Sequence, residues 1–173
     1  MVGLTVFPVR SLAGAVTDTV SIGPGGLAGD RVWTAVGEDG RPVRAKDEPA
    51  MRDVPATGEP EADAVALGTV LGRPVRMVAT ERGPDVAAVH LVSRQAVDRA
   101  AAGEVPDGCS ADDPRANLLL DLDGADERTW VGRTLRIWDA ELRVTRTPKH
   151  CLGVYADVLR PGVVRTGDPV LLV

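Results

Sequence analysis

Aromatic residues are scarce in this chain of 173 residues. They make up 3% of it, so the core must be built mainly from Val, Leu, Ile and Ala. β-Branched residues such as Val favour strands, and this composition therefore favours a β-rich fold. Apolar residues make up 44% of the chain and charged residues 26%, as in ordinary globular proteins. The length is enough for one domain, or for one domain with a small subdomain.

Cysteine and histidine are also rare, which excludes several kinds of site. The two cysteines, Cys109 and Cys151, cannot form a disulfide framework. An iron–sulfur cluster needs about four cysteine ligands, and a structural zinc site usually needs about four Cys or His ligands at close spacing. The two histidines are His90 and His150, and only His150 is close to a cysteine in sequence. Sustained redox chemistry would therefore need electrons delivered by another protein.

The chain also lacks positive net charge and long apolar runs. Its net charge is −5, whereas a general nucleic-acid binder is usually basic. No apolar run approaches the roughly 18 residues of a membrane span, and the first ten residues lack the features of a secretory signal. We therefore expect a cytoplasmic protein that has neither a membrane nor a nucleic-acid partner.

Short apolar runs separated by turn signals predict a mainly β (α+β) fold, a barrel or sandwich with two short helices. The helices are expected over residues 61–71, ended by Gly72, and from an N-cap at Ser93 to about residue 102. Strands do not alternate with long helices, which argues against a doubly wound α/β fold. The strands are predicted over residues 4–9, 16–22, 31–36, 75–79, 86–92, 116–122, 134–138, 142–145 and 169–173.

Three connecting segments carry specific expectations. Asp39-Gly40 predicts a hairpin whose return strand is residues 42–45. Residues 47–61 are rich in Pro, Glu and Asp and predict a long surface loop. The glycine-rich residues 23–29 lack the Gly-Lys-Ser/Thr ending of a phosphate-binding loop, and strand-like residues follow them where such a loop would open a helix. They are interpreted as a turn between strands.

Cys151 is the first candidate for chemistry. Lys149 and His150 precede it, and nearby positive charge lowers a thiol pKa and favours the thiolate, the form that binds metals. Adjacent residues of a strand point to opposite faces, and an inert buried cysteine is supported about as well by chemistry alone. Cys109 lies in an acidic segment, residues 107–113, that disfavours a thiolate, and is interpreted as incidental.

Two polar pairs occur at strand ends. Arg115 and Asn117 can face the same way because they are two residues apart. Arginine is a bidentate ligand of phosphate or carboxylate, and asparagine can hydrogen-bond a heterocycle edge. Taken alone, a solvated strand end explains this pair, and it also explains Arg10-Ser11.

The other polar residues suggest structural roles. His90 lies within an apolar strand and is interpreted as a core or strand-edge histidine. No Ser–His–Asp constellation stands out. Four carboxylates are interpreted as loop or capping residues: Asp112, Asp113, Asp121 and Asp123.

Taken in order, short segments along nearly the whole chain resemble those of one family. Phe7-Pro-Val-Arg-Ser11 resembles a Tyr-Pro-Val-Lys-Ser segment, and Gly26-Leu-Ala-Gly-Asp-Arg31-Val-Trp33 resembles Gly-Leu-x-x-Asp-Arg-x-Trp. The set is completed by residues 39–49, 90–93, 115–117, 130–135, Cys151 and 164–169. The chain thus resembles the MOSC domain, which is shared by the C-terminus of molybdenum-cofactor sulfurases and by the amidoxime-reducing molybdenum proteins.

The resemblance implies a single domain over residues 1–173, a β-barrel with a few short helices. Residues 1–50 would correspond to the MOSC N-terminal β segment. It also implies bound molybdenum cofactor (molybdopterin with molybdenum), with Cys151 as metal ligand and catalytic residue. The implied cofactor-binding residues are Arg10, Ser11, Arg31, Ser93, Arg115 and Asn117. Two positions depart from the family pattern, because Arg10 replaces a lysine and Arg44 replaces a threonine.

Three functions follow as expectations. The first is an oxidoreductase that reduces N-oxygenated small molecules at a Cys-ligated molybdenum and is re-reduced by an external flavin or iron–sulfur protein. The second is a non-catalytic module that binds or hands over the cofactor, or carries sulfur on Cys151. The third keeps the barrel and binds no cofactor.

Overall fold

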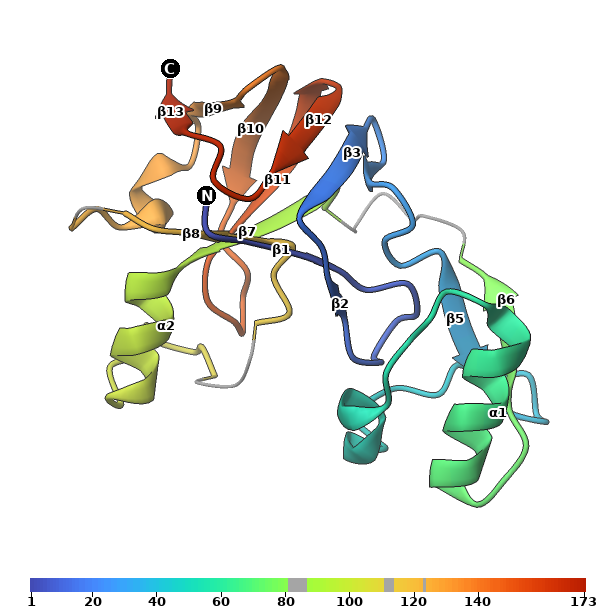
Figure 1. Cartoon of the computed structure of the whole chain (residues 1–173). Coiled ribbons are helices and arrows are strands. Elements are labelled where there is room, and N and C mark those ends of the chain that lie inside the picture. Colours follow the sequence, from blue (N-terminus) through green and yellow to red (C-terminus); the bar gives the residue numbers. More distant parts are fainter. Residues whose placement is uncertain (81–86, 111–113, 123) are drawn as a thin grey trace. The chain divides into compact units, whose positions relative to one another are not determined.

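The computed structural model describes residues 1–80, 87–110, 114–122 and 124–173 (Figure 1). The chain packs as two compact units. Unit 1 comprises Met1–Thr5, Thr17–Ala28 and Pro84–Val173, and unit 2 comprises Val6–Val16 and Gly29–Gly83. The chain passes from one unit to the other four times, after residues 5, 16, 28 and 83. None of the helices in the described ranges has the length and apolar character needed to cross a membrane.

Unit 1 is built on one large sheet with the strand order β13-β9-β10-β11-β7-β8-β1. β7 and β8 run parallel, and the other neighbours in this order run antiparallel. Every residue of β7 is buried, as its mostly apolar sequence predicts. The strands are β1 (Gly3–Val6), β7 (Val89–Ser93), β8 (Leu118–Leu120), β9 (Thr134–Ile137), β10 (Ala140–Arg146), β11 (Val154–Arg160) and β13 (Val170–Leu172).

A second sheet of unit 1 has the order β12 (Gly162–Arg165), β3 (Thr19–Gly23) and β4 (Gly26–Leu27). β3 and β4 form a hairpin in which Gly23 pairs with Gly26, so the interpretation of residues 23–29 as a turn between strands is confirmed. Gly26 has a φ of 101°, and a Cβ there would overlap the Ala88 carbonyl oxygen, so only glycine fits.

The helical elements of unit 1 follow β7 and β8. The Oγ of Ser93 accepts a hydrogen bond from the Ala96 amide (3.0 Å) at the start of α2 (Arg94–Ala101), which confirms the predicted N-cap. The 3₁₀ helix η2 (Glu127–Trp130) follows β8.

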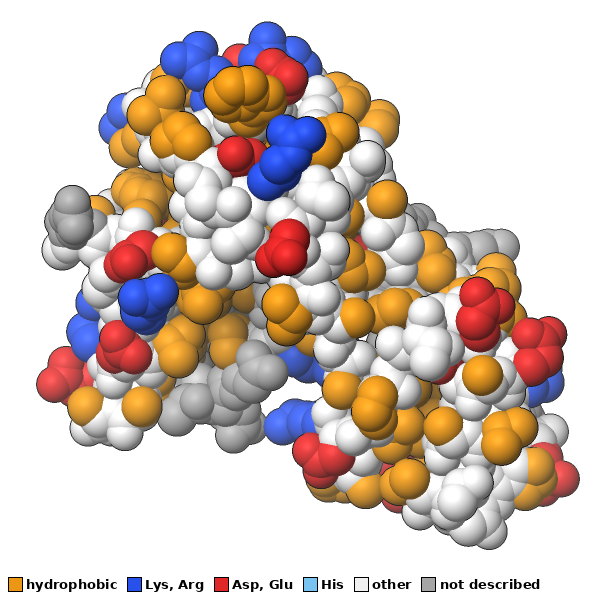
Figure 2. Space-filling view, viewed as in Figure 1, with side chains coloured by type: hydrophobic (Ala, Val, Ile, Leu, Met, Phe, Trp, Pro, Cys, Tyr) orange, Lys and Arg blue, Asp and Glu red, His pale blue; other side chains and the backbone are white. Residues whose placement is uncertain are grey.

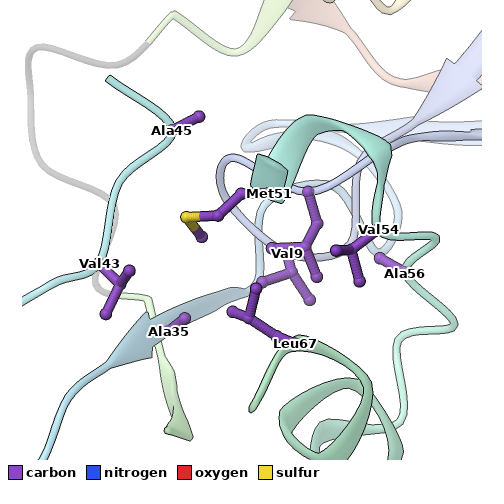
Figure 3. Close-up of a cluster of buried hydrophobic side chains, with 9 residues drawn as sticks. Val9, Ala35, Val43, Ala45, Met51, Val54, Ala56 and Leu67 are labelled. Atoms are coloured by element: carbon purple, nitrogen blue, oxygen red, sulfur yellow. The ribbon is translucent and has the colours of Figure 1, made fainter. Parts of the chain in front are cut away.

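Unit 2 contains a two-stranded antiparallel sheet, β5 (Trp33–Val36) with β6 (Arg76–Ala79), the short strand β2 (Ala15–Val16), the 3₁₀ helix η1 (Pro49–Asp53) and α1 (Pro60–Leu71). α1 ends at Gly72, whose left-handed φ of 65° matches the predicted stop. Buried side chains from several segments of the unit form its core (Figure 3), namely Val9, Leu12, Ala35, Val43, Ala45, Met51, Val54, Ala56 and Leu67.

Two expectations for unit 2 are wrong. Residues 42–45 turn back beside β5, where Pro42 makes an isolated bridge to Val36 and the Val43 amide donates to the Ala35 carbonyl (2.9 Å), but they form no strand, and the strand that pairs with β5 is β6. Proline has no N–H to donate to a ladder. Residues 47–61 are not simply a surface loop, because they contain η1 and bury Met51 and Val54. These apolar side chains point inward from a segment that is otherwise polar.

The predicted mainly β fold is confirmed, although the strands of the described residues pair as open sheets. β11 and β12 were not predicted. The first residue of the strand predicted over residues 86–92 lies outside the described ranges, and so do Asp112, Asp113 and Asp123. The expectation of a single domain stays a prediction.

Candidate functional site

The predicted site residues fall into two groups, one in each unit. Unit 2 contains Arg10, Ser11 and Arg31. Unit 1 contains Ser93, Arg115, Asn117 and Cys151. On the face seen in Figure 2, acidic and basic side chains are interspersed among apolar ones. A site for a charged ligand is therefore examined in the lining of individual pockets.

Unit 2 has a pocket of about 600 Å³, a size typical of small-molecule sites. Arg10 and Ser11 line it together with Arg44, which the sequence marked only as a departure from the family pattern. The hydroxyls of Thr34 and Thr80, also in the lining, share a hydrogen bond of 2.8 Å. No carboxylate belongs to the described part of this lining. Two arginines and several hydroxyls suit an anionic group such as a phosphate.

Arg31 is held by its neighbours at the turn before β5. Its guanidinium forms an ion pair with Asp30 and lies 5.2 Å from the centre of the Phe7 ring. Asp30 is buried and also accepts a hydrogen bond from the Phe7 amide (2.8 Å). Asp30 and Phe7 therefore fix both the turn and the direction of the arginine side chain.

Backbone strain singles out three of the six predicted cofactor-binding residues. Ser11 (φ 72°), Arg31 (φ 51°) and Arg115 (φ 52°) adopt left-handed conformations, and Trp138 (φ 52°) is the one other non-glycine residue of the described ranges that does so. The left-handed region costs a non-glycine residue about 1–2 kcal/mol. Such strain concentrates at ligand sites. Trp138 lies in the tight turn between β9 and β10, and Ser11 and Arg31 also lie in turns.

Asn117 and His90 form a buried polar link in unit 1. The backbone N–H of Asn117 donates to the His90 carbonyl oxygen (2.8 Å). In the Asn117 side chain, Oδ1 accepts from the His90 backbone N–H (3.1 Å) and Nδ2 donates to the Thr5 carbonyl oxygen (3.2 Å). The Nε2 of His90 is 2.9 Å from the Leu152 carbonyl, and its ring packs edge-on against Tyr155. The interpretation of His90 as a core histidine is confirmed. Asn117 joins strands through both ends of its amide, and its cofactor role stays a prediction.

Ser93 and Glu127 form a second buried link. Ser93 is fully buried, and its amide donates to the Glu127 Oε1 (3.2 Å) while its hydroxyl caps α2. Glu127 is also fully buried, and its Oε2 has no hydrogen-bond partner in the described part of the chain. Glu127 lies on a short 3₁₀ helix with no recognisable motif, so it could not be identified from the sequence.

Cys151 lies half-buried in the loop between β10 and β11, in contact with Cys109. The Cys109 thiol donates to the Cys151 carbonyl oxygen (3.2 Å), and Arg128 Nη1 donates to the Cys109 sulfur (3.6 Å). The acidic neighbours of Cys109 in the sequence favour the interpretation of this residue as incidental. Its contact with Cys151 depends on the fold, because 42 positions separate the two residues.

The pKa of the Cys151 thiol lies above its usual value. Burial is the main cause, and the nearby Cys109 thiol adds to it, while a hydrogen bond with Tyr155 and the charge of Arg128 act in the opposite direction. Lys149 and His150 are not among these causes, so of the two alternatives that the sequence left open the pKa direction agrees with a buried thiol. Both side chains are exposed, where water screens their charge.

The donor types present fit a molybdenum cofactor. The cofactor carries a phosphate, which suits the pocket lined by Arg10 and Arg44, and a metal bound by sulfur, to which a cysteine thiolate is a suitable further ligand. The described residues contain no cluster of three or more His, Cys, Asp or Glu side chains placed to hold a metal ion. Asp121 accepts from Gln95 (2.8 Å) and pairs with Arg94 (3.4 Å), in line with its predicted structural role.

Two solved structures have a fold similar to that of this chain. One solved structure, the YUAD protein (APC1665) of Bacillus subtilis, is 16% identical with a TM-score of 0.55, over 97% of this chain and 91% of that one. A second, described only as a hypothetical protein, is 16% identical with a TM-score of 0.50, over 98% of this chain and 66% of that one. Identities this low show the fold alone. No curated protein matches the sequence.

The family comparison covers more than half of the chain. Residues 1–106 match the family described as "MOSC N-terminal beta barrel domain". This match includes Arg10, Ser11, Arg31 and Ser93, and it confirms the MOSC resemblance seen in the sequence motifs. The chain belongs to the MOSC N-terminal β-barrel domain family.

Proposed function

We propose that this MOSC protein binds molybdenum cofactor, with Cys151 as the ligand of the metal. The observation that carries the proposal is the left-handed backbone at Ser11, Arg31 and Arg115. All three residues lie in segments that resemble the family's motifs, and that resemblance does not depend on backbone conformation. Strain that a folded protein retains at three such positions is expected when the side chains must point at a ligand.

Each residue has a distinct role in this proposal. Arg10 and Arg44 bind the phosphate of the cofactor in the unit 2 pocket, and the Ser11 hydroxyl adds a hydrogen bond. The motif resemblance also implies binding roles for Arg31 in unit 2 and Arg115 in unit 1. Asn117 and Ser93 act mainly by holding β7, β8 and α2 in place. When bound, the cofactor supplies two-electron oxygen-transfer chemistry, for which a thiolate ligand is suitable.

The reaction we propose is the reduction of an N-oxygenated small molecule. A separate flavin or iron–sulfur protein delivers the electrons, because two cysteines cannot hold an iron–sulfur cluster of the chain's own. We place this activity in the cytoplasm, without a nucleic-acid partner.

A second candidate function is favoured by the contact between Cys109 and Cys151. In this alternative the protein carries sulfur on Cys151 or hands over the cofactor, and it has no turnover of its own. A second thiol beside the carrier thiol is useful for release of sulfur, whereas oxygen transfer has no need of it.

The first test is molybdenum analysis of protein produced in a host that makes the cofactor. We expect near-stoichiometric molybdenum in the wild type and in the matched control Cys109→Ser, and its loss in Cys151→Ala. Absence of molybdenum from the wild type, in a host that loads another molybdoenzyme, would overturn the proposal.

A second measurement separates the two candidate functions. Metal-loaded protein is reduced and then mixed with an N-oxide or a hydroxylamine. Reoxidation that depends on the substrate supports the oxidoreductase, and a lack of reoxidation by either substrate supports the carrier.

A further inference from the structure

The two cysteines of the chain meet although they are far apart in sequence. The Cys109 thiol donates to the carbonyl oxygen of Cys151 itself, at 3.2 Å. The Cys109 thiol therefore points toward Cys151, the residue with which it would form a disulfide. Both thiols are free and half-buried, so a small oxidant can reach them while large molecules are hindered.

The backbones on either side keep the two residues together. The Ser110 amide donates to the His150 carbonyl (3.1 Å), a bond that lies one residue from each cysteine. The His150 Nδ1 is 3.2 Å from the Gly108 carbonyl. Three contacts thus join residues 108–110 to residues 150–151, and a disulfide requires that its two residues lie close together.

Neighbouring side chains fix the position of the Cys109 sulfur. Arg128 donates a hydrogen bond to this sulfur at 3.6 Å. The Cys109 side chain also packs against the apolar cluster of Val92, Ala96, Ala100 and Leu152. Cys109 therefore has little freedom to turn away from Cys151. Because the Cys151 thiol forms a hydrogen bond with Tyr155, the proposal requires this side chain to rotate about its Cα–Cβ bond toward Cys109.

We propose that Cys109 and Cys151 form a dithiol pair that a peroxide oxidises to an intramolecular disulfide. Hydrogen peroxide first oxidises one thiol to a sulfenic acid and releases one water. The second thiol then attacks that sulfur, which forms the S–S bond and releases a second water. The two cysteines lose two electrons and two hydrogens, and the peroxide is reduced to two waters.

This inference concerns the chain's own thiols and holds whether or not the protein binds a cofactor. If the proposed function also holds, the disulfide removes the metal-ligating thiol, and an external dithiol restores it. Oxidation state would then decide whether the protein can accept the cofactor.

The test uses the full chain, reduced, freed of reductant and treated with hydrogen peroxide. We expect the two thiols to disappear together, the mass of the intact monomer to fall by two hydrogens, and a non-reduced digest to contain a linked Cys109–Cys151 peptide. Dithiothreitol should restore both thiols. The change should be absent from Cys109→Ser and Cys151→Ser, whose remaining thiol should take up oxygen.

Two results would overturn the inference. One is that each cysteine of the wild type gains oxygen independently, at the rates seen in the single variants. The other is that disulfides form only between molecules. Molybdenum content is not used in this experiment, so its outcome is separate from that of the proposed function.

Discussion

Gly153 occupies a position that no other residue fits, two residues after Cys151. Its φ is 83°, and a Cβ would overlap the Leu91 carbonyl oxygen and approach the His90 Nε2 to 3.2 Å. The close approach lets the Cys151 loop pack directly against β7. The glycine therefore sets where the Cys151 loop lies relative to the buried His90.

We expect Gly153→Ala to destabilise the protein more than Gly132→Ala. Gly132 has a similar φ of 87° but has open space around its Cβ position. Gly132→Ala should cost about 1 kcal/mol, the penalty of left-handed backbone, and Gly153→Ala about 1–3 kcal/mol more from the overlap. Urea unfolding of both variants measures the difference. Equal losses would mean that the backbone opposite Gly153 moves aside easily.

The strain at Ser11 gives a second prediction. Glycine adopts a φ of 72° without penalty, so Ser11→Gly should leave the free energy of unfolding unchanged or raise it by up to about 1 kcal/mol. The same change removes a hydroxyl from the unit 2 pocket and should lower molybdenum retention.

The matched control for Ser11 is Trp138→Gly. Trp138 has left-handed backbone in a turn and is 60% exposed. We expect this variant to keep its molybdenum. A loss of metal from both variants, measured on folded protein, would argue against a binding role for Ser11.

Single residues of the site differed in how far the sequence could identify them. Cys151, Arg31 and Ser11 stand in recognisable motifs, so the sequence could select them. The contact of Cys109 with Cys151 and the burial of Glu127 depend on chain segments that meet only in the folded unit. The direction of the Cys151 pKa also depends on burial, which the two preceding cationic residues do not reveal.

At the scale of elements, α1 is anchored by a buried carboxylate. Asp63 is 1% exposed and accepts three hydrogen bonds, from the Thr57 amide (2.8 Å), the Thr57 hydroxyl (2.9 Å) and the Gly58 amide (3.0 Å). It ties the start of the helix to the segment that enters it. Its negative charge is also favourable near the positive end of the helix dipole.

We expect Asp63→Asn to lower the free energy of unfolding by about 1.5–3 kcal/mol, because the amide removes a charged acceptor and places its NH₂ against a donor. Glu61→Gln is the control, since Glu61 lies in the same helical turn but is exposed. Its change should stay within about 0.5 kcal/mol. Fluorescence of Trp33, which packs against the unit 2 core, reports this unfolding. Equal losses in the two variants would contradict the anchoring role.

The elements that the sequence predicted well are those with local signals. α1 and α2 have a capping residue or a stop glycine, and both were placed to within about one residue. The partner of β5 was mispredicted, because pairing with β6 depends on contacts between distant residues. β11 was missed, since its register against β10 shifts between Arg160 and Val158, the partners of Glu141 and Leu142, and this interrupts the regular alternation of a strand.

At the scale of the whole molecule, the two units are interleaved along the chain. Unit 1 uses three separate segments and unit 2 uses two. Residues 1–106, which match the MOSC N-terminal family, contain all of unit 2 but only part of unit 1. The boundary of the sequence family therefore does not coincide with the boundary of a compact unit.

This difference predicts how a fragment of residues 1–106 behaves. In the fragment β1 loses its partner β8, β3 loses β12, and β7 loses both β8 and β11. β5, β6 and α1 keep every strand and core contact described for unit 2. Hydrogen exchange should therefore show protected amides in α1, β5 and β6, and rapid exchange in β7, whereas the full chain protects all four elements. Protection of β7 in the fragment would show that it is stable without its neighbours in the large sheet. The Cys151 loop would then rest on a strand that is stable without the rest of unit 1.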